Sequence, residues 1–150
     1  MTSETLFTIC NAVALFGWLL LIGVPRWSWT IKVVRGGILP MLLAAVYLYL
    51  IVTSFGQMNG GFNSLAEVAR LFGNERVLLA GWVHYLAFDL LVGSWEVDDA
   101  SSRTIPHLLI MPCLGMTFLL GPIGYLMYRF VAFSWEKWLK SLLRRMAAKI

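Results

Sequence analysis

The sequence predicts an all-α integral membrane protein: a four-helix bundle with a short interfacial helix and a C-terminal basic amphipathic helix. Two observations lead to this prediction. Of the 150 residues, 59% are apolar and only 13% are charged, whereas about 25% of a soluble domain is charged. Residues 5–25, 36–66 and 104–128 contain no Asp, Glu, Lys or Arg, and a spanning helix needs about 20 mainly apolar residues. This composition excludes a water-soluble domain, a disordered tail and a disulfide scaffold.

Two spanning helices are predicted in the first half of the chain. The first covers residues 6–24 and is a retained helix, because neither a basic n-region nor a cleavage site accompanies it. Residues 26–35 contain two tryptophans and are expected to form a loop in the membrane–water interface. The second helix covers residues 37–55. A polar turn over residues 56–61 follows, and Ser64 with Glu67 forms a capping-box pattern that starts a short interfacial helix.

The second half predicts two further spanning helices. The third covers residues 77–95 and is followed by a short acidic loop, residues 96–103. The fourth covers residues 105–130, and Pro112 and Pro122 are expected to kink it. Residues 1–133 therefore form a four-span transmembrane domain, and residues 134–150 form an amphipathic tail.

The tail has an apolar face and a basic face at helical spacing. Its apolar face consists of Trp135, Trp138, Leu139, Leu142, Leu143 and Met146, and its basic face of Lys137, Lys140 and Arg144. This pattern is typical of a helix that lies on an anionic membrane surface. The alternative is a helix that docks on a protein partner. Because the basic residues stand beside membrane anchors, no nucleic-acid binding is expected.

The distribution of cations predicts the orientation in the membrane. Four spans place both termini on one side, together with eight of the cations, and leave four on the other side. The positive-inside rule then assigns both termini to the cytoplasm. Three cations in the first loop argue the other way. Asp89, Glu96, Asp98 and Asp99 lie in the same half of the membrane as these cations, so the carboxylates are expected to hold them.

Asp89 and His84 are ionisable residues inside a span, which makes them functional-site candidates because burying them is costly. At 100° per residue, Asp89 and Glu96 fall on one helical stripe. We predict an acid/base pair of these two carboxyls, assisted by His84 or His107. The aromatic and ring side chains predicted to bind substrate are Trp82, Tyr85, Phe88, Trp95 and His107. The alternative is a structural polar network, in which Asp89 is paired with an arginine, a tryptophan N–H or a backbone group.

Neither a metal nor a redox cofactor is expected. His84 and His107 lack the i, i+4 spacing that places two histidine ligands on one helical face. Cys10 and Cys113 both fall inside predicted spans and are expected to pack there without a disulfide. The expected partners are membrane lipids, a long apolar ligand such as a carotenoid or another isoprenoid held among the helices, and other membrane-protein subunits.

Two segments, GWVHYLAFDLLVGSW (81–95) and PHLLIMPCLGMTFLLGPIGYLMY (106–128), resemble the abscisic-acid-deficiency (neoxanthin-synthesis) family of small multi-pass membrane proteins, in its bacterial type. The matching residues are Trp82, His84, Phe88, Asp89, Gly93, Trp95, Pro112, Gly121, Pro122 and Tyr128. The resemblance is specific over residues 82–128. The basic tail after Ser134 looks like an addition.

The resemblance implies a role in carotenoid chemistry. Plant members are tied to making neoxanthin from violaxanthin, an isomerisation in which an epoxide oxygen gains a proton while a neighbouring carbon loses one. An acid and a base suffice for this step, and Asp89 and His84 are the first candidates. Two classes of function are therefore expected: an isomerase of an epoxy-carotenoid or related isoprenoid, or a non-catalytic transmembrane subunit of a pigment–protein complex. The expected location is a bacterial inner or photosynthetic membrane.

Overall fold

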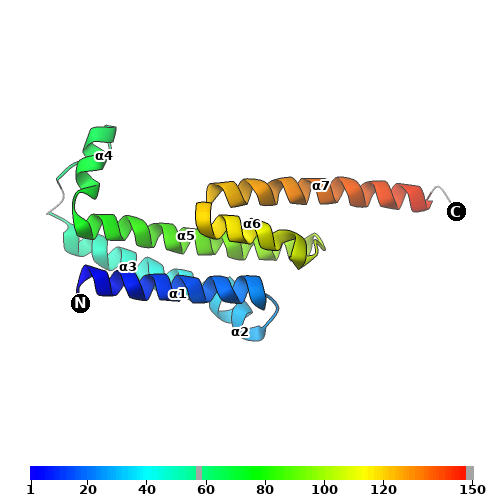
Figure 1. Ribbon diagram of the computed structural model, residues 1–150, viewed down its shortest axis with the longest axis horizontal. Coiled ribbons are helices and arrows are strands. Elements are labelled where there is room, and N and C mark those ends of the chain that lie inside the picture. Colours follow the sequence, from blue (N-terminus) through cyan, green and yellow to red (C-terminus); the bar gives the residue numbers. More distant parts are fainter. Residues whose placement is uncertain (57–58, 148–150) are drawn as a thin grey trace.

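The chain folds into an elongated assembly whose long helices lie along a common axis (Figure 1). The computed structural model describes residues 1–56 and 59–147, which contain helices and no strand. The elements are α1 (Ser3–Gly23), α2 (Ser28–Thr30), the π-helix η1 (Ile31–Arg35), α3 (Ile38–Ser54), α4 (Leu65–Phe72), α5 (Glu75–Ser102), α6 (His107–Leu120) and α7 (Pro122–Ala147). Three helical stretches are long and apolar enough to cross a membrane: Ser3–Gly23, Ser28–Ser54 and Glu75–Ser102.

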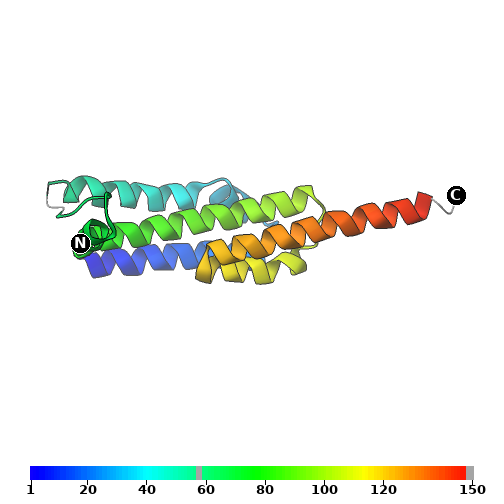
Figure 2. The same cartoon turned by 90° about the horizontal axis from the view of Figure 1, so that it is seen from above.

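Helix α5 is the central element of the bundle. Seen from above, it lies between α3 and α1 (Figure 2), and it packs against both of them and against α6. Its buried residues include Val83, Leu86 and Leu90, which join Trp18 of α1 and Leu43 of α3 in one apolar core. Because α5 contacts every long helix, its polar side chains lie where they can contact the other helices of the bundle.

Most of the segment expected to be an interfacial loop, residues 26–35, is helical: residues 28–35 form α2 and η1, whereas Arg26 and Trp27 lie in the turn before them. α2 and η1 precede α3, and the Thr30 hydroxyl donates a 2.8 Å hydrogen bond to the Val24 carbonyl. Gly36 and Gly37 separate η1 from α3, and the Gly37 φ of 83° is readily adopted by glycine. Trp27 and Trp29 are exposed, as an interfacial placement requires.

The short helix expected after Ser64 is confirmed. The Ser64 hydroxyl accepts a 3.2 Å hydrogen bond from the Glu67 amide and caps α4. α4 stands crosswise to the bundle axis and projects away from the bundle at the end where α1 and α5 begin, which we call the Ser3 end (Figure 1). Of the predicted polar turn before it, residues 57–58 lie outside the described residues.

The prediction of an acidic loop over residues 96–103 is wrong, because α5 continues to Ser102. Carboxylates at this end of the helix have partners within the protein: Asp98 pairs with Arg35, and Asp99 pairs with Arg103. Because these carboxylates form ion pairs with neighbouring arginines, they do not have to leave the helix to reach water. We call this end of the bundle the Ser102 end.

The single kinked fourth span expected over residues 105–130 is also wrong. The chain instead forms a helical hairpin, in which α6 ends at Leu120 and α7 begins at Pro122 and runs back beside α6 (Figure 1). Gly121 makes the reversal with φ of 37° and ψ of −92°. Pro122 suits the first turn of α7, where a backbone N–H would have no partner. We call residues 107–147 the α6–α7 hairpin.

The hairpin changes the position of the C-terminal tail. Residues 134–147 form no separate surface helix but continue α7, which extends along the bundle axis beyond the Ser102 end (Figure 1). Residues 148–150 of the predicted tail lie outside the described residues. The two ends of the described chain are therefore at opposite ends of the molecule, which differs from the expected arrangement with both termini on one side.

Candidate functional site

Asp89 lies against the tip of the α6–α7 hairpin. A Cβ atom placed on Gly121 would stand 2.9 Å from Asp89 Oδ1, so the turn approaches the carboxyl as closely as a glycine permits. The Oδ2 atom of Asp89 is buried and has no hydrogen-bond partner among the described residues. One helical turn earlier, the Tyr85 hydroxyl donates a 3.1 Å hydrogen bond to the Phe118 carbonyl and ties the hairpin to α5.

Glu96 is the second carboxyl on this face of α5, and it is fully buried. The Thr117 hydroxyl lies 3.0 Å and 3.1 Å from its two carboxylate oxygens and donates to them. Seven residues separate Asp89 from Glu96, which corresponds to about 10 Å along a helix. The predicted shared stripe is thus present, and both carboxyls face the α6–α7 hairpin.

His84 is not brought together with these carboxyls. Its imidazole is exposed and packs against Phe88, with ring centroids 4.5 Å apart, and against Tyr47 of α3 at 5.5 Å. Phe88 is 55% exposed on the same side of α5. The α3-facing side of α5 therefore holds His84, and the hairpin-facing side holds Asp89.

Trp82 and Tyr85 form an aromatic group with Phe7 of α1. Ring centroids lie 5.8 Å apart for Phe7 and Trp82 and 5.4 Å apart for Trp82 and Tyr85. The Trp82 indole donates a 3.2 Å hydrogen bond to the Asn11 side chain, a partner that the sequence analysis missed. The signal for it was present, because Asn11 is a polar residue inside the first span. A pocket of about 300 Å³ adjoins Phe7 and Trp82 toward the Ser3 end.

Trp95 packs on the hairpin through two tyrosines of α7, edge-on to Tyr128 and tilted against Tyr125. Its ring centroid lies 5.7 Å from that of Tyr125 and 5.6 Å from that of Tyr128. Tyr128 is fully buried, and its hydroxyl donates a 2.5 Å hydrogen bond to Asp99 Oδ2. Thr117, which engages Glu96, is a site residue that the sequence did not single out, and Tyr128, which engages Asp99, was named only among the residues that match the family.

Ion pairs concentrate at the Ser102 end. The Arg35 Nε–H donates a 2.6 Å hydrogen bond to Asp98 Oδ1, which confirms that a carboxylate of α5 holds a first-loop cation. Arg103 pairs with Asp99 at 2.7 Å and with Glu136 of α7. The hydrogen bond to Asp99 raises the pKa of the Arg103 guanidinium. Arg103 thus joins the end of α5 to the middle of α7.

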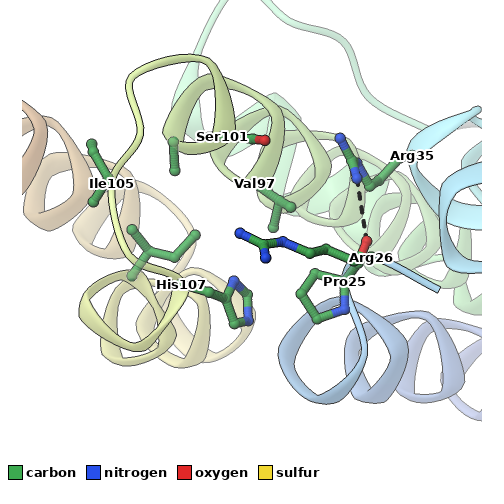
Figure 3. Close-up of a pocket in the computed structure, with 9 residues that line it drawn as sticks. Pro25, Arg26, Arg35, Val97, Ser101, Ile105 and His107 are labelled. Atoms are coloured by element: carbon green, nitrogen blue, oxygen red, sulfur yellow. Dashed lines mark hydrogen bonds between the residues drawn. The ribbon is translucent and has the colours of Figure 1, made fainter.

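His107 lies far from Asp89 in this arrangement, at the Ser102 end of the hairpin. Its Nε2–H donates a 2.9 Å hydrogen bond to the Ile22 carbonyl at the end of α1. Arg26, Arg35 and Ser101 join it around a small pocket (Figure 3). His107 therefore belongs to a separate polar site and does not assist the Asp89–Glu96 pair directly.

A buried carboxyl, Glu96, and a half-buried one, Asp89, lie against the helical hairpin, and such groups can hold and transfer protons. Together, the apolar spanning helices and this site define a small multi-pass α-helical membrane protein. The chain belongs to the ABA DEFICIENT 4-like family, whose model matches residues 5–128, and this membership relates it to neoxanthin synthesis. The match ends at Tyr128, inside α7. The comparisons with curated proteins and with solved structures found no match.

Proposed function

We propose that the protein is a membrane-embedded isomerase that moves a proton within an epoxy-carotenoid or a related isoprenoid, with Asp89 as the catalytic carboxyl. The observation that carries this proposal is the buried Oδ2 atom of Asp89, which has no hydrogen-bond partner among the described residues. Native structures pair nearly all buried polar atoms, so an unpaired one needs a functional or structural explanation. A substrate oxygen would supply the missing partner.

The proposed step needs one acid and one base. Protonated Asp89 donates its proton to the epoxide oxygen while the C–O bond breaks, and the resulting carboxylate accepts the proton that leaves the neighbouring carbon. The neighbouring carbon belongs to a C=C bond of the polyene, so the electrons of its C–H bond form a second double bond, and an allene and a hydroxyl replace the epoxide and that alkene with the proton count unchanged.

Glu96 supports this step from a distance. About 10 Å along the helix separates it from Asp89, which is too far for both carboxyls to reach one epoxide and its adjacent carbon. We therefore assign the proton transfers to Asp89 alone, and we assign Glu96, held by Thr117, the role of a positioning residue for the hairpin. His84 faces away from the pair and has no part in this mechanism.

The substrate is proposed to approach Asp89 from the Ser3 end. The α6–α7 hairpin accompanies only the part of α5 toward Ser102 (Figure 1), so beyond its tip the hairpin leaves Trp82 and Phe7 uncovered. Trp82 is 41% exposed there and Tyr85 lies between it and Asp89 along the helix. A long apolar chain could lie along these rings and present its epoxide to Asp89.

Replacement of Asp89 tests the proposal. The Asp89→Asn variant keeps the size and hydrogen-bonding groups of the side chain but cannot transfer the proton, so turnover of a supplied epoxy-carotenoid is expected to fall by about 10²–10⁴-fold. Asp98→Asn is the matched control, because Asp98 is a half-exposed carboxylate of the same helix that pairs with Arg35. Unchanged turnover in a folded Asp89→Asn variant would contradict the proposal.

One observation favours the alternative, a non-catalytic subunit of a larger membrane complex. The part of α7 that extends past the bundle leaves apolar side chains exposed, among them Trp138, Leu142, Leu143 and Met146. Mass spectrometry of gently purified protein separates the two functions. A bound isoprenoid on the isolated chain favours the isomerase, whereas stable co-purification with other membrane subunits and no isoprenoid favours the subunit.

We further propose that the N-terminus is outside the cytoplasm and the C-terminus inside it. Because α7 returns to the Ser102 end (Figure 1), that end carries most of the cations of the described chain: Arg26, Lys32, Arg35, Arg103, Lys137, Lys140, Arg144 and Arg145. The Ser3 end has Arg70 and Arg76. The positive-inside rule then places the Ser102 end in the cytoplasm, and the first-loop cations no longer conflict with it.

A further inference from the structure

We infer that the Ser102 end holds a binding site for the phosphate headgroup of an anionic phospholipid, centred on Arg26. This site lies at the opposite end of the hairpin from its tip at Asp89, and it does not depend on the proposed isomerase activity. Three features of the described residues support it: an arginine without an ion pair, a polar pocket around it, and an apolar groove that continues from that pocket.

The first feature is the guanidinium of Arg26. It lies between Val97 and His107, in the middle of the residues that line the pocket (Figure 3). Arg35 and Arg103 both have carboxylate partners, whereas Arg26 forms no ion pair with any residue among 1–56 and 59–147. A guanidinium offers paired N–H donors that match the oxygens of a phosphate, so Arg26 is a free phosphate-binding group.

The second feature is the set of hydrogen bonds that fix the backbone around the pocket. The Arg35 Nη1–H donates a 3.2 Å hydrogen bond to the Pro25 carbonyl, directly before Arg26, and the Arg35 side chain is only 18% exposed. His107 is held by the Ile22 carbonyl. These contacts join the end of α1, the start of α6 and η1, so the backbone that carries Arg26 is positioned before a ligand binds.

The third feature selects a lipid over a free anion. Pro25, Arg26 and His107 also line a wide apolar groove of about 920 Å³. The other residues of this groove are Gly23, Val24, Trp27, Pro106 and Leu108. Leu108 is 76% exposed and Trp27 is 51% exposed, so apolar surface adjoins the cation directly. In an anionic phospholipid, the phosphate can bind the Arg26 guanidinium while an acyl chain lies in the apolar groove. Basic pockets between spanning helices bind such headgroups.

Binding of phosphatidylglycerol to the delipidated full chain in detergent tests this inference. Native mass spectrometry would count bound lipid, with phosphatidylcholine and inorganic phosphate as comparison probes. Arg26→Gln is expected to bind phosphatidylglycerol about tenfold more weakly, the loss expected for one charge-assisted contact. Lys32→Gln is the matched control, since it removes the same charge from η1 outside the pocket. Leu108→Gln is expected to weaken the binding of phosphatidylglycerol. Because Leu108 is exposed, this substitution should leave the protein folded.

Each outcome decides the assignment. A folded Arg26→Gln variant that binds phosphatidylglycerol as tightly as the Lys32→Gln control would overturn it. Equal binding of phosphatidylcholine would show a groove without charge recognition, and would overturn it as well. Inorganic phosphate that binds as tightly as phosphatidylglycerol would identify a free-anion site and reject the lipid. Preferential binding of phosphatidylglycerol that depends on Arg26 and on Leu108 supports it.

Discussion

At the residue scale, two carboxyls of one helix have different surroundings. Glu96 is buried and receives a hydroxyl hydrogen bond from Thr117, whereas Asp89 has an oxygen without a partner. A satisfied buried group stabilises a fold, and an unsatisfied one costs stability unless a ligand or a water completes it. The contrast explains why we assign a positioning role to the first and a catalytic role to the second.

Removal of the Thr117 hydroxyl tests the role of Glu96. Thr117→Val keeps the shape of the side chain but leaves a buried carboxyl without its donor, so the free energy of unfolding is expected to fall by about 1–3 kcal/mol. Thr8→Val is the control, because the Thr8 hydroxyl is exposed and bonds only to the Glu4 carbonyl of its own helix. Unfolding in detergent measures both variants. Equal stability of the two would show that Glu96 does not need Thr117.

At the element scale, the α6–α7 hairpin depends on small residues at its tip. Gly121 adopts a backbone conformation that other residues rarely reach, and Gly124 packs directly on the backbone of Thr117. Hydrogen bonds from Tyr85 to Phe118 and from Tyr128 to Asp99 then hold the two arms of the hairpin on α5. The reversal is thus supported on both sides by contacts outside the turn itself.

A side chain at Gly124 is expected to separate α6 from α7. Any Cβ atom there would collide with Thr117, so Gly124→Val should lower the free energy of unfolding by about 1–3 kcal/mol through overpacking. Gly115→Ala provides a matched control in the same hairpin, because nothing lies within 4 Å of a Cβ atom at that position. The control is expected to gain up to about 1 kcal/mol from helix propensity. A neutral Gly124→Val would argue against close packing of the two arms.

At the scale of the whole molecule, the hairpin determines the topology. A fourth spanning helix would return the chain to the Ser3 end, but α7 instead brings residues 134–147 to the Ser102 end and beyond (Figure 1). The Arg103–Glu136 ion pair marks where α7 passes the end of α5. This route collects the basic residues of α7 and of the first loop on one side of the membrane.

Cysteine labelling distinguishes a hairpin from a fourth span. With Cys10 and Cys113 replaced by alanine, single cysteines at Ser101 and Ser141 are expected to be accessible from the same side, the cytoplasm, and a cysteine at Ser3 from the other. The test follows from the positions of these residues at the two ends of the bundle. A true spanning helix over residues 105–130 would place Ser101 and Ser141 on opposite sides, and that result would exclude the hairpin.

The sequence by itself determined the apolar spanning helices, the α4 cap at Ser64 and the shared face of Asp89 and Glu96. These are local properties, because composition and helical spacing depend only on nearby residues. Ion pairing of the first loop could also be predicted, since Arg35 and Asp98 have opposite charges in the same half of the membrane.

Only the tertiary structure decided that Pro122 begins a new helix and does not kink an existing one. A proline after a glycine is compatible with both outcomes, and the contacts that select the reversal come from Asp89, Thr117 and Tyr85, which lie on other turns or on another helix. Helical spacing already places His84 on a different face of α5 from Asp89, and the tertiary structure adds that the His84 face meets α3 and the Asp89 face meets the hairpin. Sequence spacing shows which residues share a face, whereas packing determines what each face meets.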